Sequence, residues 1–129
     1  MLIVYTDGRV DRIADFPYVH PSPENPSATV SSKDVTISPH ISAIIYLPRL
    51  VAADKKLPIL IWFHGGGFCI ESPFSSLYHH YLKILTSEAQ AVVVSVEYRL
   101  APENPLTTAY EDCWEALQWV ASQDYHWRR

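Results

Sequence analysis

The chain has 129 residues, of which 48% are hydrophobic and 19% are charged. This composition is typical of one soluble globular domain and excludes disordered, collagen-like and multidomain proteins. Ten lysines and arginines stand against 14 aspartates and glutamates, a net charge of −4, so we expect no nucleic-acid partner, because such a partner would need a basic surface.

The cysteines and the first residues favour a reducing compartment. Cys69 and Cys113 lack the Cys-x-x-Cys spacing of metal and redox sites, so we expect both to be free thiols. Five charged residues among the first 15 interrupt the apolar core that a signal peptide would need. The longest apolar runs are far shorter than the ~20 residues that cross a bilayer. We therefore expect a cytoplasmic protein with no membrane partner.

The first part of the chain predicts a hairpin, a loop and two more strands. Residues 2–5 and 9–13 flank Asp7 and Gly8, a pair that accepts the positive φ angles of a tight hairpin turn. Four prolines within residues 15–32 favour an extended surface loop. The next segments are rich in β-branched and aromatic residues and predict a second pair of strands. These segments are residues 35–37 and 43–47.

The next part predicts two buried strands joined by a helix. Residues 59–63 and 91–96 are almost entirely apolar, as expected for strands that are covered on both faces. Between them, residues 74–88 repeat apolar side chains at helical spacing, and Pro73 suits the first turn of that helix. Alternating buried strands and helices predict an α/β sheet.

A second helix is expected to begin near Thr108. Its hydroxyl and Glu111, three residues later, form a capping-box pattern. The apolar stripe of this helix is predicted to comprise Tyr110, Cys113, Leu117 and Val120.

Three of the four glycines follow the first buried strand directly, in the string His64, Gly65, Gly66, Gly67, Phe68. Without Cβ atoms, their peptide N–H groups are unshielded and can stabilise an oxygen that becomes negative when a carbonyl is attacked, as in an oxyanion hole. The alternative is a tight turn that only allows close helix packing. A phosphate-binding loop is disfavoured because neither of its glycine spacings is present and no lysine follows.

Several motifs in the same order resemble the hormone-sensitive-lipase-like group of α/β-hydrolases, and within it the plant carboxylesterases. The amino-terminal residues are similar to that group as well, so the resemblance covers nearly the whole chain. The motifs are 64–68 (HGGGF), 97–103 (EYRLAPE), 110–112 (YED) with Ala116, Leu117, Trp119 and Val120, and, near the start, 4–10 and 31–35.

The resemblance implies a carboxylic ester hydrolase of the serine type that acts on small-molecule esters and needs no cofactor. The N–H groups of Gly66 and Gly67 in the loop 65–67 would bind the oxyanion. Residues 1–129 would be the N-terminal part of a single α/β-hydrolase domain with a mixed, mostly parallel sheet and flanking helices. The triad is not expected in this chain, because Gly8 is the only glycine outside the loop and no Gly-x-Ser-x-Gly can occur. The chain alone is predicted to be inactive.

Two alternatives share the fold that this resemblance implies. The plant gibberellin receptors look similar and would need only a binding pocket, but they tend to carry serine at the position of Gly67, which favours the esterase. A 2-hydroxyisoflavanone dehydratase-like relative would keep the same glycine loop. The residue at the nucleophile position would distinguish these alternatives from the esterase.

The remaining candidate residues are interpreted as structural. His64 is expected to support the glycine loop rather than act as a base, whereas Phe68 could line a substrate pocket. Arg99 is expected to pair with Glu103 and tie down the loop after the second buried strand. The adjacent carboxylates at 111 and 112 diverge on a helix and are explained by a solvated face and a cap. No two histidines have helical metal-ligand spacing, so no metal site is predicted.

Overall fold

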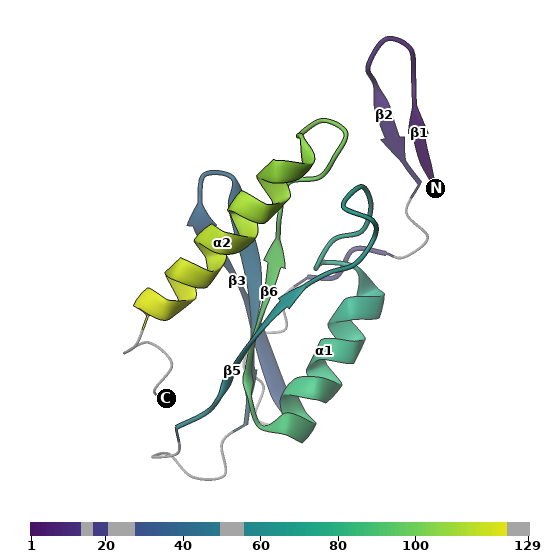
Figure 1. Cartoon of the computed structure of the whole chain (residues 1–129). Helices are drawn as coiled ribbons and strands as arrows, with labels where there is room; N and C mark the ends of the chain where they lie inside the picture. Colours follow the sequence, from purple (N-terminus) through teal and green to yellow (C-terminus); the bar gives the residue numbers. More distant parts are fainter. Residues whose placement is uncertain (14–16, 21–27, 50–55, 124–129) are drawn as a thin grey trace.

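The computed structural model describes residues 1–13, 17–20, 28–49 and 56–123. Strands β1 (Leu2–Val4) and β2 (Val10–Arg12) form an antiparallel hairpin, whose turn contains Gly8 at a φ of 89°. This confirms the hairpin prediction. Figure 1 shows that the hairpin projects from one end of the molecule. Half of the predicted proline-rich loop lies outside the described residues. Its last three residues, 30–32, belong to a strand of the main sheet, so the prediction of a loop was wrong there.

The main sheet has four strands in the order β3-β4-β6-β5. Strands β3 (Val30–Ser38) and β4 (Ile41–Pro48) extend beyond the two strands predicted there. Strand β6 (Val92–Glu97) pairs antiparallel with β4 and parallel with β5 (Ile59–Phe63). The sheet is mixed, as expected, but it is not mostly parallel, because two of its three described pairings are antiparallel.

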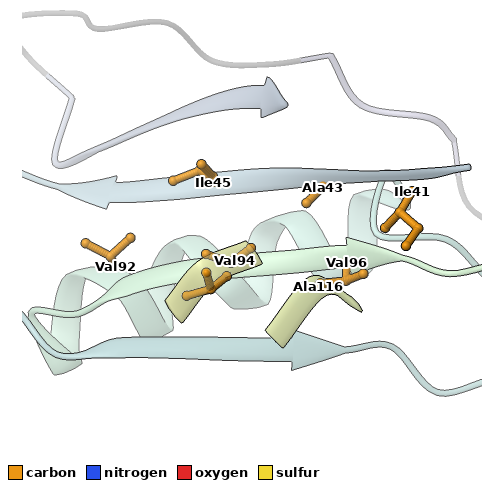
Figure 2. Packing of buried hydrophobic residues seen from close by; sticks show 8 residues of the cluster. Ile41, Ala43, Ile45, Val92, Val94, Val96 and Ala116 are labelled. Carbon is orange, nitrogen blue, oxygen red and sulfur yellow. The ribbon is translucent and has the colours of Figure 1, made fainter. Parts of the chain in front are cut away.

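One helix covers each face of this sheet (Figure 1). Alternate residues of β4 and β6 point to α2 (Leu106–Ser122), and Figure 2 shows this cluster around Ala116. The intervening residues of the same strands, including Val93 and Tyr46, pack with Leu82 of α1 (Ser76–Ala89). Burying both faces of β4 and β6 explains their nearly continuous apolar sequences.

Strand β5 lies at the edge of the described sheet, and this limits its burial. Its residues pack on both sides as predicted, with Ile61 and Phe63 toward α2 and Leu60 and Trp62 toward α1. All four are nevertheless only half-buried, and Ile59 is 39% exposed. Both strands are therefore covered on both faces as predicted, but β5 is less completely buried than β6 because it lies at the edge of the described sheet.

The second helix begins two residues earlier than predicted, at Leu106, and its first turn differs from the expected capping box. Thr108 lies inside the helix, and no side chain of the described residues caps the N-terminus. The buried face is formed by Thr108, Ala109, Asp112, Ala116 and Val120. The predicted stripe was wrong at Tyr110 and Leu117, which are exposed, because small residues, rather than the largest apolar ones, face the sheet.

The first helix begins at Ser76 rather than at residue 74. Phe74 is buried just before it, and the backbone N–H of Val19 donates to the Phe74 carbonyl. Neither helix of the described residues is long and apolar enough to cross a membrane.

Candidate functional site

The glycine loop, residues 65–67, lies between the end of β5 and the start of α1. Gly66 and Gly67 adopt φ angles of 117° and 61°, which other residues rarely accept. A Cβ atom at Gly66 would also overlap the carbonyl oxygen of Ile70. Glycine is therefore required at position 66 by both backbone angle and space.

Hydrogen bonds hold each of three successive carbonyl groups in this segment. The Tyr98 hydroxyl donates to the carbonyl of His64 at 2.6 Å, and the Nδ1 of His64 donates to the carbonyl of Gly65 at 2.7 Å. The carbonyl of Gly66 accepts from the backbone N–H groups of Cys69 and Ile70, both at 3.2 Å. The orientation of three consecutive peptide planes is thereby fixed.

Each of the same three peptide planes also carries an N–H group, which points away from the carbonyl. A trans peptide is planar and directs its N–H opposite to its C=O, so holding the carbonyls of residues 64–66 also orients the N–H groups of Gly65, Gly66 and Gly67. No acceptor among the described residues takes a hydrogen bond from these three amides. Gly65 and Gly67 are exposed. The loop therefore presents pre-oriented donors, an arrangement that can bind an anion or a developing oxyanion.

His64 is almost fully buried, with 3% exposure, and stacks on Tyr98 with ring centroids 4.4 Å apart. Because a carbonyl can only accept, Nδ1 must carry the proton, which leaves Nε2 as an acceptor with no partner among the described residues. Burial lowers the pKa of His64 and so favours the neutral ring. Burial also raises the pKa of Tyr98 to about 12, so its phenol remains a donor.

Phe68 continues the loop in a left-handed conformation, with a φ of 63°. Its half-buried ring lies near two other aromatic rings, with centroids 6.2 Å from Tyr98 and 5.6 Å from Tyr110. Its carbonyl accepts from the N–H of Ala101 at 2.9 Å, which connects the glycine loop to the segment after β6.

The predicted pairing of Arg99 with Glu103 was wrong. Arg99 instead binds the carboxylate of Asp112 through Nε at 3.0 Å and through a terminal nitrogen at 2.7 Å. The Asp112 side chain is 1% exposed, so it is no solvated face. Glu103 pairs with Arg12 of β2. The position of Asp112 among small, buried residues of α2 was the missed signal, because a carboxylate there needs a cation.

Ser72 and the two cysteines are the next side chains to consider for chemistry. Ser72 accepts from the N–H of Phe74, a local bond expected before a helix, and donates to the carboxylate of Glu97 in β6. Cys69 and Cys113 are free thiols, as predicted. Among the described residues, no group of three histidine, cysteine or acidic side chains could hold a metal ion.

The sequence is similar to several curated plant proteins. Tabersonine synthase of Catharanthus roseus is 59% identical over 120 residues, and 2-hydroxyisoflavanone dehydratase of Glycyrrhiza echinata is 56% identical over 124. Probable carboxylesterase 13 of Arabidopsis thaliana is 48% identical over 129. These matches cover 92%, 95% and 95% of this chain, but only 38%, 38% and 39% of the relatives.

Solved structures agree with this similarity. An esterase of Pyrobaculum calidifontis is 34% identical, with a TM-score of 0.67, over 88% of this chain and 33% of that one. The sequence model of a family described as the alpha/beta hydrolase fold matches residues 60–129, which is more than half of the chain. The match includes the glycine loop, β6 and α2. By this match the chain belongs to the alpha/beta hydrolase fold family, as its motifs predicted.

Proposed function

We propose that this chain forms the oxyanion-binding part of a carboxylic ester hydrolase that acts on small-molecule esters. The observation that carries the proposal is the glycine loop, in which three carbonyls are held and the neighbouring amides are left as donors. The similarity to an esterase of known structure and to a probable carboxylesterase supports the reaction class. The chain spans about 38% of the length of the curated relatives, so the reaction is proposed for a protein that includes more than these residues.

The proposal assigns one role to each residue of the loop. The amides of Gly66 and Gly67, with Gly65 beside them, donate to the carbonyl oxygen as it gains negative charge during attack. His64 holds the Gly65 carbonyl in place, and the exposed part of Phe68 lines the substrate pocket. Such donors act through prior orientation, because they need not reorganise as the charge develops.

A nucleophile is the part of the reaction that this sequence does not supply. No Gly-x-Ser-x-Gly occurs in the 129 residues, and polarising donors without an attacking group do not complete an acyl transfer. We therefore propose that the isolated chain does not hydrolyse esters. A cytoplasmic location remains a prediction.

A second candidate is a dehydratase that eliminates water from a hydroxylated flavonoid. The 56% identity to a 2-hydroxyisoflavanone dehydratase favours it. The same loop would then stabilise an oxyanion formed next to the carbon that loses a proton. The residue at the nucleophile position separates the two, since an esterase needs a serine there.

A chimera tests the proposal directly. Residues 1–129 replace the matching segment of probable carboxylesterase 13, and the product is assayed with p-nitrophenyl butyrate and with 2-hydroxyisoflavanone. We expect ester hydrolysis, with a serine that a fluorophosphonate labels. A folded chimera that is labelled yet shows no turnover of the ester would contradict the esterase proposal. The chimera takes its nucleophile from the carboxylesterase, so the second candidate is tested by the residue at the nucleophile position of the longer protein to which this chain belongs. Any residue other than serine there would favour the dehydratase.

A further inference from the structure

We propose that Arg12 is a positioning residue for the glycine loop; the inference rests on the proposed function of that loop. Arg12 ends β2 in the hairpin, yet its side chain reaches two segments far along the sequence. Its Nε donates to the carbonyl of Cys69 at 2.6 Å, and one terminal nitrogen donates to the carbonyl of Ala101 at 2.8 Å. Both terminal nitrogens also bind the carboxylate of Glu103, at 2.5 and 2.7 Å.

This guanidinium is the link between the hairpin and the site. The hydrogen bonds found between residues 1–13 and the described residues 56–123 all come from Arg12. The hairpin forms its own two-stranded sheet, separate from the main one. The planar fork of arginine suits this role, because it can engage two carbonyls and a carboxylate at once.

The contact to Cys69 reaches the proposed oxyanion donors through two peptide planes. Arg12 holds the Cys69 carbonyl, and the same peptide unit carries the N–H of Ile70 on its opposite side. That N–H donates to the carbonyl of Gly66, whose peptide unit carries the N–H of Gly67. Fixing the first carbonyl therefore helps to fix the direction of the Gly67 donor, and hydrogen bonds in such a chain also polarise one another.

The hydrogen bond from Arg12 to Ala101 stabilises the turn after the glycine loop through a second segment of the chain. Arg12 holds the Ala101 carbonyl, while the N–H of Ala101 donates to the carbonyl of Phe68 at 2.9 Å. Two adjacent carbonyls after the glycine loop are thus held, one directly by Arg12 and one through Ala101. Glu103 completes the arrangement by neutralising the cation, so Arg12 acts by orientation rather than by supplying charge to the oxyanion.

The test compares Arg12→Met with Arg9→Met and Arg12→Lys in the chimera described above. Arg9 is the matched control, because it lies in the same hairpin but pairs with Asp7 within it. We expect Arg12→Met to lower kcat by at least about 10-fold with little change in KM, since a misplaced donor affects the reaction step. Arg12→Lys should recover part of this loss, because an ammonium can still bind one carbonyl, and Arg9→Met should match the wild type.

A second readout uses the 129-residue chain itself. Hydrogen exchange of the Cys69, Ile70 and Ala101 amides, followed by NMR, should become faster in Arg12→Met while amides of β6 stay unchanged. Unchanged kcat together with unchanged exchange at these amides would overturn the role of Arg12. If the wild-type chimera is folded and labelled but has no activity, the proposed function fails instead, and the exchange measurement alone then decides whether Arg12 holds the loop.

Discussion

Asp112 of α2 accepts three hydrogen bonds from Arg99, two from its guanidinium and one from its backbone N–H at 2.9 Å. Arg99 follows β6, so this pair fastens the C-terminal end of the strand to the helix that covers it. The carboxylate is buried and the guanidinium is 34% exposed. Arg99 also directly precedes the segment 100–103, which carries the Ala101 and Glu103 contacts of Arg12.

Replacing Asp112 with alanine should destabilise the chain by about 2 kcal/mol in the free energy of unfolding. The reason is the loss of charge-assisted hydrogen bonds together with an unpaired backbone N–H at Arg99. Exposure of the Arg99 side chain lets water compensate part of the loss, which keeps the value below that for a fully buried pair. Urea unfolding measures this loss. The control is Glu111→Ala, which removes an exposed neighbouring carboxylate and should change the free energy of unfolding by no more than ~0.5 kcal/mol. Equal effects of the two variants would contradict this role of Asp112.

Arg99 and Asp112 also show where sequence reasoning reaches its limit. Local patterns correctly predicted the hairpin at Gly8, the bounds of β5 and the buried β6, because turn chemistry and apolar runs are local properties. Proximity in sequence predicted that Arg99 pairs with Glu103. In the fold, Arg99 pairs with Asp112, and Glu103 pairs with Arg12. These contacts depend on how β2, β6 and α2 come together. The position of Asp112 among small residues of α2 indicated that it needs a cation, but not which one.

For the candidate site too, the sequence predicted features that are local but not the contacts between distant residues. The motif predicted which residues would supply donors, with a tight turn for close helix packing as the alternative. It did not indicate what orients them. The Tyr98 hydroxyl on His64, and Arg12 on the Cys69 carbonyl, connect positions 34 and 57 residues apart in the sequence.

His64 is expected to be neutral, in its Nδ1-protonated form, at any pH above the usual histidine pKa of about 6.5. Burial lowers its pKa in the folded chain, so the folded state binds fewer protons than the unfolded state near and below the usual histidine pKa. The neutral ring therefore contributes stability that is present above about pH 6.5 and is lost as the pH falls through its lowered pKa. Nitrogen chemical shifts of the imidazole ring, followed from pH 8 to pH 4, measure both tautomer and titration. Titration of His64 at or above the usual pKa of histidine would contradict this expectation.

The ion pair between Arg12 and Glu103 should contribute to acid sensitivity. Its hydrogen bonds lower the pKa of Glu103 to about 2, so the pair contributes stability above the usual pKa of glutamate and loses it as the pH falls toward 2. Glu103→Gln should therefore show a shallower fall in unfolding free energy than the wild type between pH 5 and pH 2.5. Glu115→Gln, which removes an exposed carboxylate of α2, serves as the control. Parallel curves for wild type and Glu103→Gln would show that protonation of Glu103 does not contribute to the pH dependence of the unfolding free energy.

Gly66→Ala should damage both stability and turnover more than a substitution that only strains the backbone. Its Cβ atom would overlap the Ile70 carbonyl, so relief requires moving the turn that holds the Gly66 carbonyl and, with it, the Gly67 donor. We expect a loss of at least about 100-fold in kcat in the chimera, as for a displaced oxyanion donor. In urea unfolding of the chain, the loss in the free energy of unfolding should exceed the ~1 kcal/mol that left-handed backbone strain alone would cost.

The matched control for this variant is Gly8→Ala. Gly8 also has a positive φ, 89°, but a Cβ atom there meets nothing within 4 Å. Gly8→Ala should therefore lose only the strain energy and keep the wild-type kcat, because the hairpin tip is remote from the glycine loop. A Gly66→Ala chimera with wild-type kcat would mean that the turn can shift without moving the donors, and the assignment of the Gly67 amide would then fail.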